Sequence, residues 1–297
     1  MTIKVILNPY ANRWGAKRRL AQVKLALTEA GLDYDLFVTS RHQEATAVAK
    51  EAAASGSYAA VIAAGGDGTV NEVVNGLIAA AAPDQPTVPF GVLPIGTGND
   101  FNDMAGLPRQ LAQCAEVIAR GRTRQVDAGQ VNDYYFDNNC AVAMEPMITI
   151  ENIKMKRLSG NIRYIVALIK GLLKLQAWHM NIQWDGGEYE GPTFLLSVCN
   201  SPRTGGLFYM SPPARMDDGL LDFVLLPEVS KPVVVALLPR LFKGTHIQHP
   251  RVLHGRTQRL HLTSTPGTPI HADGEVIADA AASVTYQILP GKITLLS

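Results

Sequence analysis

The sequence has few cysteines, almost no net charge and no long apolar run, and each shortage excludes a class of protein. Its three cysteines, Cys114, Cys140 and Cys199, lie far apart and form no CxxC pair. They predict buried or inert thiols rather than a disulfide framework or a thiolate zinc site. The formal net charge of +1 disfavours a protein that covers nucleic-acid phosphates with a basic surface. We therefore expect no nucleic-acid partner.

No segment of the chain reaches the roughly 18 consecutive apolar residues of a membrane span, and residues 1–8 lack the apolar region of a signal peptide. These features predict a cytoplasmic protein. Any lipid that it uses would be met from the water side, by peripheral contact at the inner face of the membrane. With 47% hydrophobic and 18% charged residues the chain should be globular, and 297 residues suggest two domains.

The first part of the chain, residues 1–125, repeats one pattern of a short apolar strand, a loop of turn residues and an amphipathic helix. Such alternation predicts an α/β domain built on a parallel sheet. Ligands of these sheets bind beyond the carboxyl ends of the strands. The predicted strands cover residues 3–7, 34–38, 58–64 and 88–93, and the predicted helices cover residues 17–30, 42–55 and 111–119, the last of them closed by Gly121.

From residue 126 the pattern changes to strand-like alternation, as in Trp178, Met180, Ile182 and Trp184. This predicts a second, mainly antiparallel β domain over residues 126–290. The closing residues 291–297 could return to either domain. The helix predicted over residues 162–175 has an apolar stripe that suits either core packing or a membrane surface. Further strands are predicted at 193–199, 220–226, 259–263 and 283–289, with another helix at 233–242.

Two glycine-rich loops follow the third and fourth predicted strands. In the first, Gly65 to Glu72, the backbone can approach an oxyanion closely, and Thr69 and Glu72 have the spacing of a capping box that would start a helix. The second, Pro94 to Phe101, should lie at the same edge of the sheet. Neither loop is a Walker A sequence, and Gly96-Thr97-Gly98 lacks the third glycine of a dinucleotide fingerprint. The two loops predict a polyphosphate site of another kind.

Three weaker signals lie in the second part of the chain. Asp273-Gly274 separates two apolar strands, so Glu275 should stand at a hairpin tip, where it could act as a base or only belong to a turn. Asp217-Asp218-Gly219 is also typical of a solvated turn. His246 and His249 have a spacing that zinc could use. Because no third ligand is near, we expect a surface or loop role instead.

The glycine loops together resemble the diacylglycerol kinase catalytic-domain family, which includes bacterial lipid kinases and sphingosine kinases. The resemblance rests on Gly65-Gly66-Asp67-Gly68-Thr69 followed by Asn71-Glu72, and on Pro94 to Phe101. It continues in order through Arg124 to Asp127, Ser211 to Asp222 and Ala272 to Glu275, and so spans nearly the whole chain. It implies an N-terminal domain like that of NAD kinase and phosphofructokinase and an ATP- and Mg²⁺-dependent kinase that acts on a lipid hydroxyl such as that of diacylglycerol.

The resemblance also implies roles for single residues. Glu275 would be the general base, and Asp67 would order a bridging metal or its waters. Mg²⁺ would be held by Asp218 with the backbone carbonyls of Arg215 and Leu220, and linked through waters to Asp67 or Asp127. The expected ATP site consists of Asn8, Thr39, Gly65, Gly66, Asp67, Gly68, Thr69, Asn71, Glu72 and Thr97.

The sequence departs from the family pattern at two places. Ala11-Asn12 stands where members commonly have Ser-Gly or Ala-Gly, and Ala143-Met144-Glu145 stands where Gly-Phe-Asp is usual. Two alternatives remain open, an NAD kinase-like enzyme and a nucleotide-responsive lipid-binding protein without catalysis. In the NAD kinase family the Asn-Glu pair is remote from the glycine loop. The expected partner is a lipid met by transient membrane contact, and the oligomeric state stays open, with a homodimer as one option.

Overall fold

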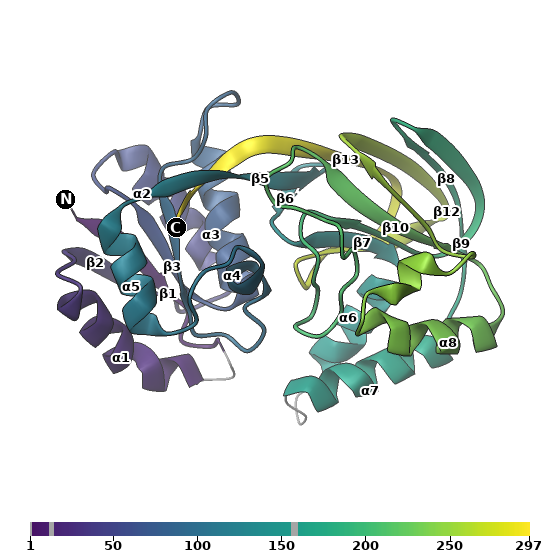
Figure 1. The fold of residues 1–297 in the computed structure, drawn as a ribbon, viewed down its shortest axis with the longest axis horizontal. Coiled ribbons are helices and arrows are strands. Elements are labelled where there is room, and N and C mark those ends of the chain that lie inside the picture. Colours follow the sequence, from purple (N-terminus) through teal and green to yellow (C-terminus); the bar gives the residue numbers. More distant parts are fainter. Residues whose placement is uncertain (1, 12–14, 156–159) are drawn as a thin grey trace. The chain divides into compact units, whose positions relative to one another are not determined.

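The computed structural model of the protein describes residues 2–11, 15–155 and 160–297. The chain divides into two compact units (Figure 1). The first comprises Met1–Ala128 with Leu289–Ser297, and the second comprises Gly129–Ile288. Two strands contribute to both units, β5 (Thr123–Val131) and β13 (Glu275–Leu296). Each unit is described by itself below.

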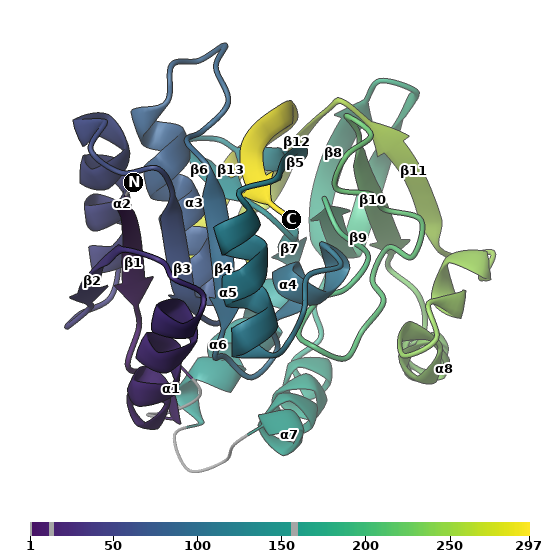
Figure 2. The same ribbon diagram turned by 60° about the vertical axis from the view of Figure 1, so that its left-hand side comes forward.

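A parallel sheet forms the centre of the first unit. Its strands follow the order β2-β1-β3-β4-β13, and the pairs that join β1 to β2, β1 to β3 and β3 to β4 are parallel. Helices cover both faces, with α1 and α5 on one side and α2 and α3 on the other (Figure 2). The elements are β1 (Ile3–Leu7), α1 (Gly15–Glu29), β2 (Tyr34–Val38), α2 (Glu44–Ser55), β3 (Val61–Gly65), α3 (Asp67–Ala80), β4 (Phe90–Pro94), α4 (Asp100–Met104) and α5 (Leu111–Arg120).

Apolar spacing explains how the helices of the first unit pack. Val23 and Leu27 on α1 and Ile118 on α5 belong to one buried cluster with Val5 and Ile62 of the sheet. Helix α5 ends where the sequence predicts, at Gly121, which adopts a φ of 65°. Because glycine takes this left-handed conformation without a Cβ clash, the helix stops there. Strand β3 begins at Val61, later than residue 58 where the apolar pattern begins.

The C-terminal residues complete the first unit, which decides the question that the sequence left open. Leu295 pairs in parallel with Phe90 of β4. The Lys292 ammonium lies 2.7–2.9 Å from the carbonyl oxygens of Ala82, Pro83 and Gln85 and donates to all three. The last strand is therefore fixed both in the sheet and to the loop after α3.

The second unit is an antiparallel β structure. Its strand order is β11-β10-β9-β7-β12-β13, and β8 pairs with both β9 and β12. The alternation that predicts β8 is confirmed, because Trp178, Met180 and Ile182 are buried and the residues between them are exposed. The strands are β6 (Tyr134–Phe136), β7 (Asn139–Ala143), β8 (Trp178–Trp184), β9 (Gly187–Cys199), β10 (Leu221–Pro227), β11 (Leu253–Thr257) and β12 (Arg259–Ala272).

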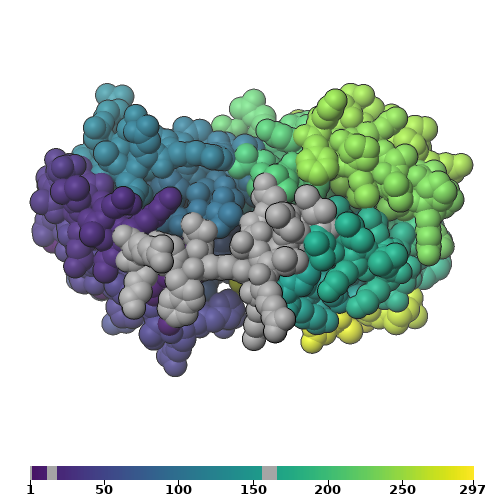
Figure 3. Space-filling model, turned by 90° about the horizontal axis from the view of Figure 1, so that it is seen from below, coloured from purple at the N-terminus to yellow at the C-terminus, as the bar shows by residue number. Residues whose placement is uncertain are grey.

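Among its described residues the second unit has four helical segments: α6 (Met144–Lys154), α7 (Gly160–Leu173), α8 (Lys231–Leu241) and the 3₁₀ turn η1 (Thr245–Gln248). Leu172 of α7 packs against the apolar cluster that contains Val234 and Leu237 of α8, and the two helices lie side by side in Figure 3. Of the predicted apolar stripe on α7, Leu172 packs into this core cluster, whereas Ile169 and Leu173 are 52% and 77% exposed. The predicted stripe is therefore divided between core and surface, and the side chains of its members Ile162 and Ile165 lie outside the described residues.

The three cysteines and His246 bear on two predictions. All three cysteines are free and buried, which confirms the prediction of buried thiols. His246 is buried rather than at the surface, and its Nε2 lies 2.9 Å from the carbonyl oxygen of Met210. The part of the chain that the structure describes holds no group of three or more His, Cys, Asp and Glu side chains suited to a metal.

Candidate active site

The two glycine loops of the first unit touch each other through their backbones. Strands β3 and β4 are in register from Val61–Phe90 to Gly65–Pro94, so both loops leave the same edge of the sheet. The amides of Ile95 and Gly96 both donate to the carbonyl oxygen of Gly65, at 2.9 and 3.1 Å. A Cβ placed on Gly96 would lie only 2.3 Å from the Cα of Gly66. Glycine is thus required at position 96, whereas a Cβ on Gly66 would lie 3.1 Å from the Cα of Gly96 and be tight.

The first loop leads directly into α3, but not through the predicted capping box. The helix begins at Asp67, and its N-cap is Gly66, which has no side chain to act as a cap. The Thr69 hydroxyl instead accepts a hydrogen bond from the Asn8 side-chain amide at 3.1 Å. Glu72 accepts the backbone amide of Ala45 at 3.2 Å and therefore caps α2 rather than α3. The capping-box prediction is wrong because a partner distant in sequence binds each of its two side chains.

The start of α3 has the electrostatics of an anion site. The first amides of a helix cannot bind a carbonyl within that helix, and the helix dipole adds a positive partial charge at the same end. One oxygen of Asp67, at the start of α3, accepts the amide of Phe101 at 3.1 Å and so joins the first loop to the start of α4. Asp67 also brings a negative charge to this place, and phosphate groups would tolerate that charge best with a cation between them.

The structure places the other residues expected at the ATP site as follows. Asn8 directly follows β1 and contacts Thr69, as described above. Thr39 follows β2, is buried and donates its amide to Leu7 at 2.9 Å. Asn71 is buried on α3, whereas Thr97 is exposed at the tip of the second loop. Asn8, Thr39, Thr69 and Thr97 all follow or flank the carboxyl ends of the parallel strands, where ligands of such sheets bind. Asn12 lies outside the described residues.

The predicted base stands on a tight hairpin in the second unit. Asp273 and Gly274 have φ values of 47° and 86°, and Ala272 pairs with Glu275 across the turn. The Asp273 carboxylate accepts the backbone amides of Asp137, Asn138 and Asn139 at 2.8–3.0 Å. These three bonds, which the sequence analysis missed, fix the turn beside Glu275. The run Asp137-Asn138-Asn139 is a weak turn signal on its own, and nothing local links it to residue 273.

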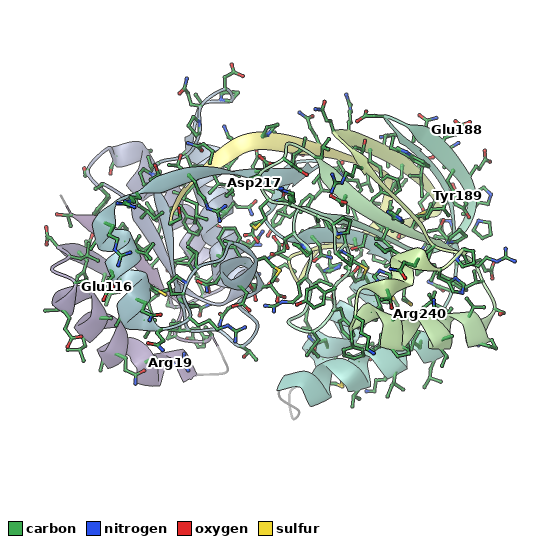
Figure 4. The ribbon with its side chains drawn as sticks, in the orientation of Figure 1. Arg19, Glu116, Glu188, Tyr189, Asp217 and Arg240 are labelled. Carbon is green, nitrogen blue, oxygen red and sulfur yellow. The ribbon has the colours of Figure 1, made fainter. Side chains whose placement is uncertain are left out.

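The residues expected to hold Mg²⁺ also lie within the second unit, in the turn before β10; the neighbouring Asp217 is labelled in Figure 4. Asp218 accepts the amide of Leu220 at 3.2 Å, and its second oxygen lies 3.8 Å from Arg256. Buried Asp222 lies close by and pairs with the same Arg256 at 3.3 Å, and burial raises the pKa of its carboxyl. A carboxylate and two backbone carbonyls are all hard oxygen ligands, so the donor set fits Mg²⁺.

One departure from the family pattern has a visible structural consequence. Ala143 has a φ of 69°, in the region that favours glycine. Its amide donates to the Thr268 hydroxyl at 2.9 Å. The chain thus keeps at Ala143 a backbone conformation that costs an alanine about 1–3 kcal/mol.

Comparison with known proteins identifies the family. The sequence model of the diacylglycerol kinase catalytic domain matches residues 2–131, and that of the YegS C-terminal NAD kinase beta sandwich-like domain matches residues 144–297. A diacylglycerol kinase of Bacillus subtilis (strain 168) is 31% identical over 274 residues, covering 92% of this chain and 89% of that relative. The chain belongs to the diacylglycerol kinase catalytic-domain family. It is accordingly a kinase that transfers a phosphoryl group to a hydroxyl acceptor.

Further members support the same assignment. A diacylglycerol kinase of Staphylococcus carnosus (strain TM300) is 31% identical over 275 residues, covering 92% of this chain and 88% of that relative. The crystal structure of a diacylglycerol kinase from Bacillus anthracis str. Sterne has a TM-score of 0.73 at 21% identity and covers 99% of this chain and 96% of that one. At this identity the structure shows a shared fold: an N-terminal α/β domain followed by an antiparallel β domain.

Proposed function

We propose that this diacylglycerol kinase family member transfers the terminal phosphoryl group of ATP to the hydroxyl of a lipid, with diacylglycerol as the first candidate acceptor and Mg²⁺ as the required cation. The observation that carries the proposal is the backbone contact between Gly66 and Gly96. It joins two amide-rich loops into one surface at the carboxyl edge of the sheet, and such a surface fits a chain of phosphates.

In this proposal the first unit binds and orients the nucleotide. The start of α3 and the loop around Gly96 would hold the phosphates, while Asn8 and Thr39 would line the site from the neighbouring strands. Asp67 would face a cation bound with the phosphates, because its carboxylate would otherwise repel them. Phosphoryl transfer depends mainly on such alignment and charge stabilisation.

Glu275 is the proposed general base. The acceptor oxygen attacks the terminal phosphorus, the bond to the bridging oxygen breaks, ADP leaves, and the hydroxyl proton moves to the Glu275 carboxylate. Glu275 is only partly buried, so its carboxylate is accessible to a substrate. The hydrogen bonds from three backbone amides to the Asp273 carboxylate keep the turn beside Glu275 rigid.

The proposed Mg²⁺ ligands are Asp218 and the carbonyls of Arg215 and Leu220. Bound there, the ion would supply positive charge to a turn where Asp218 and Asp222 lie close together. Arg256 already contacts both carboxylates, at 3.8 and 3.3 Å. It would share the neutralisation of this cluster with the metal.

The lipid is proposed to be met at a membrane surface. No helix among the described residues has the length and apolar character to cross a membrane. Helices α7 and α8 instead expose Ile169, Leu173 and Val235 beside cationic side chains such as Lys170 and Arg240, the second of which is labelled in Figure 4. Exposed apolar groups beside basic ones suit the surface of an anionic bilayer.

The test uses labelled ATP, Mg²⁺ and a total lipid extract, with mass identification of the labelled product. We expect a phosphorylated lipid, and no transfer to NAD in a parallel assay. Glu275→Ala should lower turnover by about 10²–10⁴ while ATP affinity is retained. Glu188→Ala is the matched control, because Glu188 is exposed on a hairpin of the same unit (Figure 4). Labelled NAD with no labelled lipid, or full turnover in Glu275→Ala, would contradict the proposal.

A further inference from the structure

The second unit contains a buried contact between a carboxylate and a histidine to which the proposed reaction assigns no role. Glu145, the second residue of α6, is only 4% exposed, and His271 of β12 is only 3% exposed. The Oε1 atom of Glu145 lies 3.3 Å from the His271 Nε2 and accepts the side-chain amide of Asn139 at 2.9 Å. One carboxylate oxygen therefore contacts residues of two neighbouring strands, β7 and β12.

Stability alone does not account for this pair. The other oxygen of Glu145 and both ring nitrogens of His271 are buried without a geometrically satisfied hydrogen bond to any described residue, so Nε2 meets Glu145 only through the 3.3 Å contact. Burial by itself would raise the pKa of the Glu145 carboxyl, but the contacts with His271 and Asn139 outweigh it, so the pKa lies below its usual value. Glu145 is thus held as a buried anion. Buried charged groups beside unsatisfied polar atoms seldom stabilise a fold more than apolar residues of the same size would.

Both partners of Glu145 hold the turn that carries Glu275. The backbone amide of Asn139 donates to the Asp273 carboxylate at 2.9 Å, and its carbonyl oxygen accepts the Asp273 amide at 2.9 Å. His271 pairs across the hairpin with Val276, directly after Glu275. Two separate routes, one through each partner, therefore lead from a single carboxylate oxygen to the same hairpin.

The start of α6 places Glu145 at this position. The chain turns from β7 into the helix at Ala143, with its φ of 69°, and Glu145 follows two residues later. The Asn139 side chain extends the contact further, because its amide also donates to the Ser197 hydroxyl at 3.2 Å and its oxygen accepts the Thr204 hydroxyl at 2.9 Å. The network thus ties α6, β7, β9 and β12 together beneath the turn.

We propose that Glu145, acting with His271 and Asn139, is a positioning residue for the Glu275 turn. The proposal rests on the role of Glu275 proposed above. Glu145 does not touch the reacting atoms in this account. It fixes the backbone on both sides of Asp273, so that the Glu275 carboxylate stays within reach of the acceptor hydroxyl. A displacement of about 1 Å at such a group can lower a rate by about 10²-fold.

The test compares Glu145→Gln and His271→Gln with wild type in mixed micelles of detergent and diacylglycerol, with ATP and Mg²⁺ at saturation. We expect each variant to lower kcat by about 10- to 100-fold. The KM for diacylglycerol and the separately measured binding constant for ATP should stay within about twofold of the wild-type values. The double variant should be no more than about threefold worse than the poorer single variant, because the two side chains act as one unit.

Glu151→Gln is the matched control. Glu151 lies on the same helix and is 6% exposed, and its carboxylate pairs with Lys174 at 2.8 Å and with Lys154 at 3.6 Å rather than with the hairpin. It should lower the melting temperature without lowering kcat. If Glu145→Gln fails to fold, His271→Gln carries the test, because its amide can still donate to the Glu145 carboxylate and leave no bare buried charge.

The possible outcomes separate this inference from the proposed function. The positioning role would be overturned if the single variants kept the wild-type kcat, or lost no more of it than Glu151→Gln does. An inactive Glu275→Ala variant would still support Glu275 as the general base in that case. Additive losses in the double variant would also overturn it. Full turnover in Glu275→Ala would overturn both proposals together.

Discussion

The contact between the two glycine loops gives the most direct test of the nucleotide site. In Gly96→Ala the new Cβ would lie 2.3 Å from the Cα of Gly66 and 2.7 Å from the Oδ1 of Asn99. The first distance is more than an ångström shorter than the 3.4 Å at which ordinary contact begins. The obstructing atom belongs to the backbone of the β3–α3 turn, so no side chain can rotate to relieve the clash and the loops must separate.

Overpacking of this kind costs about 1–3 kcal/mol, and we expect a loss near the upper end because backbone has to move. Separation of the loops by about 1 Å would also spoil their common surface for phosphates. ATP affinity should therefore fall by at least about tenfold, a change of about 1.4 kcal/mol. The assays are urea unfolding and titration calorimetry with ATP and Mg²⁺.

Alanine variants of two further glycines serve as comparisons for Gly96→Ala. In Gly66→Ala the nearest atom would be the Cα of Gly96 at 3.1 Å, so a shift of a few tenths of an ångström suffices and the losses should be smaller. In Gly186→Ala, in the β8–β9 hairpin, the nearest atom would lie at 3.6 Å, and both stability and ATP binding should remain at wild-type values. Equal effects of Gly96→Ala and Gly186→Ala would refute the reasoning.

Two other predictions concern the stability of each unit. Ala143→Gly should raise the free energy of unfolding by about 1 kcal/mol, because relief of strain at a φ of 69° exceeds the added chain entropy of glycine, and an unchanged or lower urea midpoint would contradict this. Asp35→Asn should destabilise the protein at pH 7, because hydrogen bonds from Lys4 at 2.7 Å and Tyr58 at 2.6 Å lower the pKa of the Asp35 carboxyl below 3.8. Because the pKa of Asp35 is lowered in the folded state, its contribution to stability is complete above pH 3.8 and is lost as the pH falls through the folded-state pKa. The difference in free energy of unfolding between Asp35→Asn and wild type should therefore disappear in that acid range. A difference that persists in acid would contradict that origin.

Local patterns in the sequence determined most of the regular elements. The alternation of Trp178, Met180 and Ile182 has a period of two, which only a strand with one buried face satisfies. Gly121 predicted the end of α5 because few other residues adopt its left-handed conformation at low cost. The neighbouring positions of the glycine loops also followed from the sequence, since consecutive parallel strands place their carboxyl ends at one edge.

Only the tertiary structure decided which partners the polar side chains bind when those partners are distant in the sequence. The capping box of Thr69 and Glu72 has the right spacing, yet Asn8 and Ala45 bind these side chains instead. Strand β7 and helix α6 were missed as well. The residues from Asn139 to Lys154 show no simple periodicity of apolar side chains. In β7 the reason is that the strand lies between β9 and β12 and is buried throughout.

The amino-acid sequence thus specified what is local: the two kinds of unit, the glycine loops, and a hairpin that presents Glu275. Tertiary structure decided which residues meet across long stretches of chain, such as Asp273 with the amides of residues 137–139, Glu145 with His271, and Leu295 with Phe90. The physical reason is that periodicity records which face of an element is buried. A hydrogen bond or a parallel strand pair between distant segments leaves no such periodic trace in either of them.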